Sequence, residues 1–182
     1  MELVTDLARM TRLAKEREAE NWSFRWFLKK TDRPPGEIDG IVHALWEEVS
    51  GQIDCTQCAS CCRLLRPYLS PQDVKRLSRH LRISGALFEA RYLLPAKEGD
   101  EDGRPLAVRP CPFLRESRCT VYPARPAACR SYPGLHKPDF IGRASQAFTS
   151  CAVCPVVFNV YEGLKRALAE APPERPAGGH AQ

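Results

Sequence analysis

The chain has 182 residues, which is enough for one domain of ordinary size and too few for two. Hydrophobic residues make up 43% of it and charged residues 27%, so a globular core can form without disulfides or metal ions to support it. The formal charge of +5 would suit an acidic partner such as nucleic acid. That figure counts nine cysteines as neutral, although a dication held by four thiolates carries a net charge of about −2. The positive formal charge is therefore weak evidence for a nucleic-acid partner, and we do not expect one.

The beginning of the chain carries acidic residues early and lacks the apolar segment of a signal peptide. No stretch approaches the roughly 20 apolar residues that span a bilayer. We therefore expect a cytoplasmic protein with no membrane partner. Thiols stay reduced in that compartment, so the cysteines favour metal binding over disulfides.

The first 30 residues are predicted to be helical. Apolar residues recur along them at helical spacing, at Leu3, Leu7, Met10 and Ala14. An aromatic cluster follows, formed by Trp22, Phe24, Trp26 and Phe27. We interpret this cluster as a core or docking face, through which a protein partner could bind. A Pro-Pro-Gly break then ends an N-terminal amphipathic and aromatic helical segment over residues 1–36.

Four further helices are predicted along the chain. They cover residues 37–53, a segment that starts with the capping box at Ser70 to Asp73, residues 84–94 and residues 156–170. Residues 106–108 and 119–122 are predicted to pair as a small hairpin. The expected fold is mainly α with short irregular strands, in a cysteine-rich, metal-centred domain over residues 37–171 with helices at both ends. The Pro- and Gly-rich residues 172–182 are predicted to form a disordered tail.

The nine cysteines fall into two groups, and all nine are candidate metal ligands. The first group contains Cys55, Cys58, Cys61 and Cys62, and the second contains Cys111, Cys119, Cys129, Cys151 and Cys154. A two-residue gap lets a tight turn point two sulfurs at one ion, and backbone N–H groups of that turn can bond the thiolates. Nearby arginines could offset the thiolate charge; they are Arg63, Arg66, Arg109, Arg118 and Arg130.

The spacing allows zinc or iron, in one centre or two. Eight thiolates would make two four-cysteine zinc sites and leave one cysteine spare. Because Cys61 and Cys62 are adjacent, we expect their side chains to point in different directions, so one of them is a candidate for the spare. The run that opens with Cys55 and has remote Cys-Pro pairs at Cys111 and Cys154 is also typical of a [4Fe–4S] cluster.

Catalytic motifs are not evident in the sequence. It has no Gly-rich phosphate loop, no His-Glu-x-x-His and no nucleophile elbow, and its four histidines suit surface or capping roles. We therefore name no catalytic residue and favour a non-enzymatic role. An enzyme stays open as the alternative, because an open position on a metal requires no further motif.

Four motifs in order resemble the YkgJ-type cysteine-cluster family, which is described as zinc- or iron-chelating. They are Cys55 to Arg63, Pro110 to Leu114, Cys119 to Tyr122, and Arg125 to Pro133. The resemblance covers about residues 53–155 and departs from the family at Ala59, where members often carry glycine. It implies metal chelation. Because the chain has nine cysteines and no other catalytic constellation, our leading hypothesis is an intracellular metal-binding protein with a mainly structural centre and an accessory or binding role. A related cluster in flagellin lysine methylases is associated with an iron–sulfur centre, so the alternative is electron transfer or support of a modification such as lysine methylation.

Overall fold

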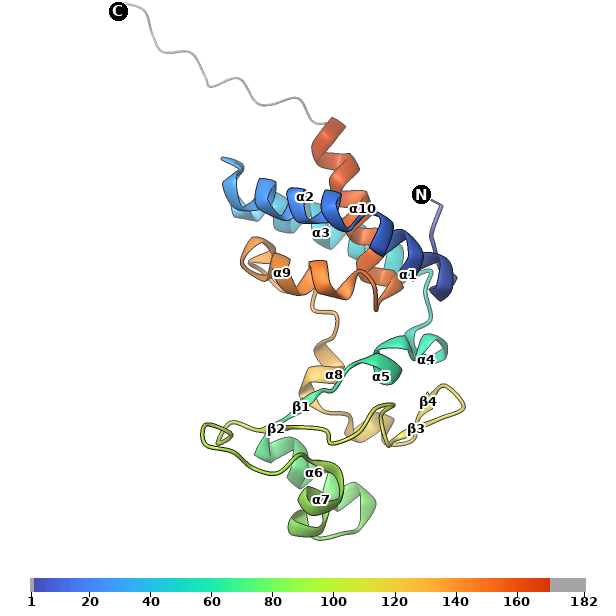
Figure 1. Cartoon of the computed structure of the whole chain (residues 1–182), viewed down its shortest axis with the longest axis vertical. Helices are drawn as coiled ribbons and strands as arrows, with labels where there is room; N and C mark the ends of the chain where they lie inside the picture. Colours follow the sequence, from blue (N-terminus) through green and yellow to red (C-terminus); the bar gives the residue numbers. More distant parts are fainter. Residues whose placement is uncertain (1, 171–182) are drawn as a thin grey trace, which may run out of the picture.

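A computed structural model describes residues 2–170, so the tail predicted for residues 172–182 lies outside the described residues. Its elements form three layers along the long axis of the molecule (Figure 1). Helices from both ends of the chain form an upper layer, short cysteine-bearing elements form a middle layer, and a helix pair forms a lower layer. The mainly α fold with short strands is confirmed. No helix within residues 2–170 combines the length and the apolar character needed to cross a membrane.

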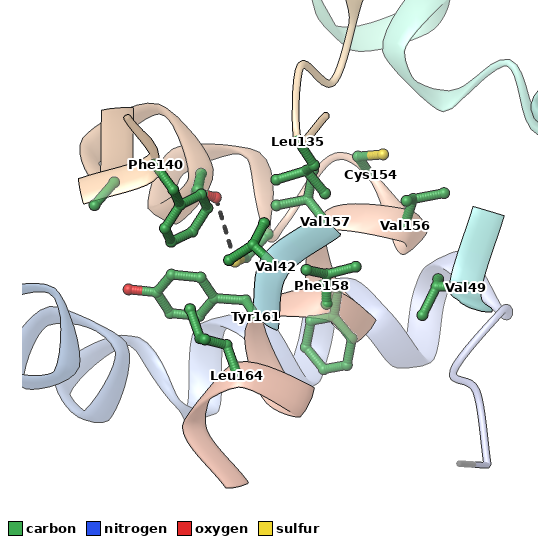
Figure 2. Packing of buried hydrophobic residues seen from close by; sticks show 14 of the residues in the cluster. Val42, Val49, Leu135, Phe140, Cys154, Val156, Val157, Phe158, Tyr161 and Leu164 are labelled. Carbon is green, nitrogen blue, oxygen red and sulfur yellow. Dashed lines mark hydrogen bonds between the residues drawn. The ribbon is translucent and has the colours of Figure 1, made fainter. Parts of the chain in front are cut away.

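The upper layer is a bundle whose helices are far apart in the sequence. It consists of α1 (Leu7–Glu16), α2 (Glu18–Lys30), α3 (Pro35–Ser50), α9 (Phe140–Ser150) and α10 (Pro155–Glu170). Their buried apolar side chains, which include Val42, Phe158 and Tyr161, form one hydrophobic cluster (Figure 2). Helices α3 and α10 approach each other closely, since a Cβ atom at Gly163 would lie 2.9 Å from Leu45 Cδ2. The bundle therefore has its own core.

Polar side chains anchor the N-terminal residues on α10. The buried Asn159 side chain accepts a hydrogen bond from the Val4 N–H at 2.8 Å and donates one to the Val4 carbonyl at 2.9 Å. The helical prediction for the first 30 residues is confirmed from Leu7 onward, as two helices that are separated at Arg17, which pairs with Glu162 of α10. Helix α2 follows directly on α1 along the bundle (Figure 1).

The aromatic cluster of α2 divides between core and surface. Phe24 packs edge-on against the buried Tyr161, with 5.3 Å between ring centroids. Trp22, Trp26 and Phe27 are 48%, 45% and 44% exposed. Part of the cluster is therefore a core face, and binding of a protein partner through the exposed part stays a prediction.

The lower layer contains β1 (Tyr68–Leu69), α6 (Pro71–Leu81), α7 (Gly85–Tyr92) and β2 (Arg104–Pro105). The predicted capping box is confirmed: Ser70 Oγ accepts from the Asp73 N–H, and the Asp73 carboxylate accepts from the Ser70 N–H, both at 3.2 Å. Side chains of these elements and of neighbouring segments form a second hydrophobic cluster, which includes Leu77, Phe88 and Leu106.

Two pairs of very short strands replace the predicted hairpin, whose pairing was wrong. Strand β1 pairs with β2, and β3 (Leu114–Arg115) pairs with β4 (Arg118–Cys119), both antiparallel. Leu106 instead bridges to Leu93. The β3–β4 turn has positive φ at both central residues, Glu116 and Ser117, which is the geometry of the turns that suit two-residue hairpins. The turn therefore brings Cys119 back beside the residues that follow Cys111.

The middle layer also contains four short helices. They are α4 (Cys55–Cys58), α5 (Ser60–Leu64), the 3-10 helix η1 (Tyr122–Ala124) and α8 (Ala127–Ser131). Helices α4 and α8, both described in full, contain no buried residue, and in α5 only Ser60 is buried. Isolated helices of this length are unstable in water. Helices α4, α5 and α8 must therefore be held in place by contacts other than an apolar face of their own.

Gly103 has a large expected effect on the lower layer. Its φ is +146°, and a Cβ atom there would lie 2.4 Å from the Leu69 carbonyl oxygen in β1. We expect Gly103→Ala to lower the free energy of unfolding by about 2–3 kcal/mol, because both the backbone conformation and the contact are unfavourable. Gly99→Ala is the matched control, since Gly99 also has positive φ but no atom within 4 Å of the added Cβ. Equal losses in denaturant unfolding would contradict this explanation.

Candidate metal centre

All nine cysteines are free thiols. Seven lie in or beside the middle layer: Cys55 and Cys58 in α4, Cys61 and Cys62 in α5, Cys111 before β3, Cys119 in β4 and Cys129 in α8. Cys151 follows α9 and Cys154 precedes α10, so these two lie at the edge of the upper bundle. The short elements that carry cysteines of both sequence groups thus lie between the upper bundle and the lower helix pair (Figure 1).

The first group is arranged by two consecutive short helices. Asp54 caps α4 by accepting a hydrogen bond from the Thr56 N–H at 2.8 Å, and hydrogen bonds from Thr56 lower the pKa of Asp54. Ala59 then adopts a left-handed conformation with φ 50° and joins α4 to α5. This conformation is the physical reason that glycine suits the position.

The thiols of Cys61 and Cys62 meet, contrary to the expectation that they point in different directions. The Cys61 thiol donates a hydrogen bond to the Cys62 sulfur. This bond raises the pKa of Cys61, and burial raises it further. The same bond lowers the pKa of Cys62 to about 7, with help from Arg63 and Arg125. Cys62 is therefore the sulfur in this pair that favours the thiolate form.

Hydrogen bonds of the backbone place part of the second group beside the first. The Cys111 N–H donates to the Cys62 carbonyl at 2.8 Å. Helix α8, which carries Cys129, is tied to the lower layer by the Ala127 N–H, which donates to Asp73 Oδ1 at 3.0 Å. Segments about 50 residues apart in the sequence therefore converge through specific polar contacts.

Backbone N–H groups point at three of the sulfurs. The donors are Phe113 and Leu114 for Cys111, Val121 for Cys119, and Val156 and Val157 for Cys154. Burial raises the pKa of each of these thiols, to about 11 for Cys154, and the N–H groups act in the opposite direction. Cys154 also lies at the N-terminus of the long helix α10, where the helix dipole favours an anion. Hydrogen bonds of this kind orient and stabilise thiolate ligands.

Two buried donors complete the surroundings of the cysteines. Within residues 2–170, Arg125 Nε and Tyr132 Oη are buried without a well-formed hydrogen bond, although Ser150 and Cys154 lie beside the Tyr132 hydroxyl. Arg125 lowers the pKa of Cys62, and its guanidinium lies 3.6 Å from the centroid of the Tyr122 ring. Burial and then the proximity of Cys154 raise the pKa of Tyr132. Unpaired buried donors are costly, and a neighbouring thiolate is an acceptor that would satisfy them.

Arg125 was not among the arginines singled out in the sequence. Its position four residues before Cys129, within the last family-like motif, is the signal that could have identified it. His136, by contrast, lies with its ring 5.4 Å from the Trp46 ring, which agrees with a packing role for this histidine.

As the side chains stand, no three Cys, His, Asp or Glu residues within residues 2–170 form a group that could hold a metal ion. Two of the thiols instead act as hydrogen-bond donors, Cys61 to the Cys62 sulfur and Cys151 to the Ala147 carbonyl. The donor set nevertheless fits a metal that binds thiolates, because it combines many sulfurs with N–H groups and cations that favour their charged form. Binding would begin with loss of the thiol protons.

The fold and these donors define a small, mainly α protein with a cysteine-lined centre. The sequence model of the CxxCxxCC family, described as "Putative zinc- or iron-chelating domain", matches residues 54–155, which is more than half of the chain. The protein belongs to this family, and the resemblance drawn from the motifs is confirmed. Neither the curated proteins nor the solved structures gave a match.

Proposed function

We propose that the protein binds zinc or iron through its cysteines, and that the centre is mainly structural and joins the upper and lower layers. The observation that carries this proposal is the position of the cysteines between two separate hydrophobic clusters. The short helices α4, α5 and α8 of the layer between the clusters bury little apolar surface. A metal bound by thiolates from both sequence groups would supply the cross-link that packing does not.

A protein with such a centre serves as a binding module or accessory factor in a reducing compartment, for which we propose the cytoplasm. Nine free thiols support this assignment, because an oxidising compartment would drive them to disulfides. The exposed aromatic residues of α2 are the proposed contact for a protein partner.

An iron–sulfur centre for electron transfer, or in support of a modification such as lysine methylation, is the second candidate. It is favoured by the N–H groups directed at Cys111, Cys119 and Cys154, since hydrogen bonds to sulfur tune the potential of such clusters. Oxygen-free purification should then give a coloured protein with iron and sulfide in equal amounts. A colourless protein that contains only zinc would exclude this candidate.

Hydrogen exchange tests the joining role. We compare amide protection in metal-loaded and metal-free protein under reducing conditions. Amides of the β3–β4 hairpin and α8 are expected to lose protection when the metal leaves, while those in the middle of α10 serve as the internal reference because they belong to the upper core. Unchanged protection in the hairpin and α8 would refute a structural role.

The Tyr132→Phe variant distinguishes a packing role of Tyr132 from a role in supporting the metal ligands. The Tyr132 hydroxyl is buried without a well-formed hydrogen bond within residues 2–170, and its neighbours are Ser150 and Cys154, so its removal should leave the metal-free protein equally stable or more stable. If this hydroxyl supports a metal-bound sulfur, the same change should weaken metal affinity by about 10-fold or more. Competition with a chelator measures the affinity. A loss of stability without any loss of affinity would assign Tyr132 to packing alone.

A further inference from the structure

Three cysteines of the second sequence group surround Cys62. Cys111 donates its N–H to the Cys62 carbonyl at 2.8 Å. Leu114 pairs with Cys119 across the hairpin and donates its N–H to the Cys111 carbonyl at 3.0 Å. Cys111 and Cys119 therefore lie at the same end of the hairpin, and both pack against the lower hydrophobic cluster.

Cys129 completes this arrangement from α8, which the Asp73–Ala127 hydrogen bond holds against α6. After burial, the groups that raise the pKa of Cys129 are Cys111, Cys62 and Cys119. Cys62 and Cys119 likewise act on Cys111, and Cys62 acts on Cys119. Each of these four sulfurs is thus an electrostatic neighbour of the other three.

The remaining cysteines of the first group have Cys154, at the start of α10, as a common neighbour. Cys55 and Cys58 lie on the single turn of α4, and they are the cysteines that act on the buried Cys154 at the start of α10. Cys61, which is hydrogen-bonded to Cys62, has Cys154 and then Cys129 as its further neighbours, so it lies where the two groups of sulfurs meet. Figure 2 shows Cys154 at the edge of the hydrophobic cluster, with its sulfur pointing away from the aromatic rings. This sulfur is therefore available to a ligand outside the bundle.

Cys151 is placed differently, although it forms a Cys-x2-Cys pair with Cys154. It is 2% exposed within the upper hydrophobic cluster, and its thiol donates to the Ala147 carbonyl at 3.3 Å in the last turn of α9. The charged side chains near it are Glu162 and Lys165 of α10. A thiol that is bonded inside a helical core is not directed toward the middle layer.

We propose that the cysteines form two four-sulfur sets, each of which holds one metal centre, and that Cys151 belongs to neither. The upper set is Cys55, Cys58, Cys61 and Cys154, and the lower set is Cys62, Cys111, Cys119 and Cys129. This inference rests on the proposed metal-binding function and specifies the ligands of each centre. The hydrogen-bonded pair Cys61 and Cys62 supplies one sulfur to each set, so the two centres are neighbours.

Arg125 fits the space between two such centres. It is an electrostatic neighbour of Cys55 in the upper set and of Cys62, Cys119 and Cys129 in the lower set. A dication with four thiolates carries a net charge of about −2, so a half-buried cation between two of them offsets part of their repulsion. The unpaired Nε of Arg125 is the donor that a thiolate of either set would accept.

Metal counting by native mass spectrometry tests the assignment. The full-length protein, reconstituted with zinc under reducing conditions, is expected to hold two ions. Cys151→Ala should keep both, whereas Cys58→Ala and Cys111→Ala should each lose one, and the double variant should lose both. Cobalt(II) in place of zinc gives a second readout, because the absorption of tetrahedral thiolate sites should halve in each single variant and stay unchanged in Cys151→Ala.

Stepwise removal of metal from the wild-type protein by a chelator shows which cysteines share an ion. It needs no substitution, so it can be used even if a variant does not fold. Freed thiols are trapped by alkylation and located by peptide mass spectrometry. They are expected to appear as one complete set before the other. Loss of an ion in Cys151→Ala, a double variant that loses no more than either single variant, or trapped thiols mixed between the sets would each overturn the assignment. Failure of the wild type to bind metal at all would instead refute the proposed function.

Discussion

Removal of the metal by a chelator, under reducing and oxygen-free conditions, is expected to unfold the middle and lower layers. Structural zinc contributes about 10–16 kcal/mol in small domains, and a whole protein of ordinary stability has about 5–15 kcal/mol. The short helices α4, α5 and α8 bury almost no apolar surface of their own, so packing cannot replace that contribution. The upper bundle has a separate core and should keep part of the helical signal.

Circular dichroism during thermal unfolding measures this effect. The metal-free protein should show a reduced helical signal and lose the main transition, and added zinc or iron should restore both. Cys151→Ala is the matched control, since its buried thiol lies outside the proposed ligand sets and its metal-dependent transition should match that of the wild type. An unchanged melting temperature after complete metal loss would show that the centre is not structural.

The helices with strong local signals could be predicted from the sequence. The apolar stripe of α3, the capping box of α6 and the periodic residues of α10 each specify a helix without help from the rest of the chain. Helix α9 was not predicted, because its buried face includes the small residues Ala144 and Ala147 and gives a weak pattern. Its cap is also unusual, since Asp139 begins it in a left-handed conformation and accepts from the Gly142 N–H at 3.1 Å.

The hairpin shows a different limit. Strands of two residues carry no alternating pattern, so the turn determines the pairing rather than the strand sequence. The turn residues Glu116 and Ser117 are not the Asn-Gly or Asp-Gly pairs that announce such a turn. The apolar run over residues 106–108 therefore led to the prediction that it pairs with residues 119–122, whereas Leu106 bridges to Leu93.

Cysteine spacing predicts that the chain binds metal, but it does not show which cysteines bind the same ion. Cys151 and Cys154 have the spacing of a metal-binding pair, yet one thiol bonds to a helix carbonyl in the core and the other faces outward. The neighbours of Cys62 depend on a hydrogen bond to Cys111, which is 49 positions away in the sequence. Contacts of this kind are set by tertiary structure, so spacing alone leaves the ligand sets open.

Asp73→Ala is expected to lower the free energy of unfolding by about 3–5 kcal/mol, the range for removing one partner of a buried ion pair. The Asp73 carboxylate is 3% exposed, pairs with Arg76 and accepts hydrogen bonds from the Ser70 and Ala127 N–H groups. Without it, Arg76 loses its partner while its guanidinium still bonds the Arg125 carbonyl at 2.8 Å. We also expect weaker metal affinity, because the segment that it holds leads directly into α8.

Ser70→Ala is the matched control, since it removes the other half of the capping box and leaves the bond between Asp73 and Ala127 intact. It should cost only about 1 kcal/mol in denaturant unfolding and leave metal affinity unchanged. Equal losses in the two variants would reduce the role of Asp73 to helix capping and would remove it from the support of α8.

The effect of Asp73 also has a defined pH dependence. Burial acts to raise the pKa of its carboxyl, but hydrogen bonds from the Ala127 N–H and Arg76 outweigh burial, and the pKa is lowered in the folded protein. A group with a lowered folded pKa stabilises fully above its unfolded pKa, about 3.9 for Asp, and loses that contribution as the pH falls through the folded value. The stability difference between the wild type and Asp73→Asn should therefore be constant near neutral pH and shrink below about pH 4.

Because acid also releases metal from thiolates, both proteins are compared in the same metal state at each pH. A difference that persists undiminished in acid would mean that the carboxylate charge contributes nothing and that Asp73 acts through its shape alone.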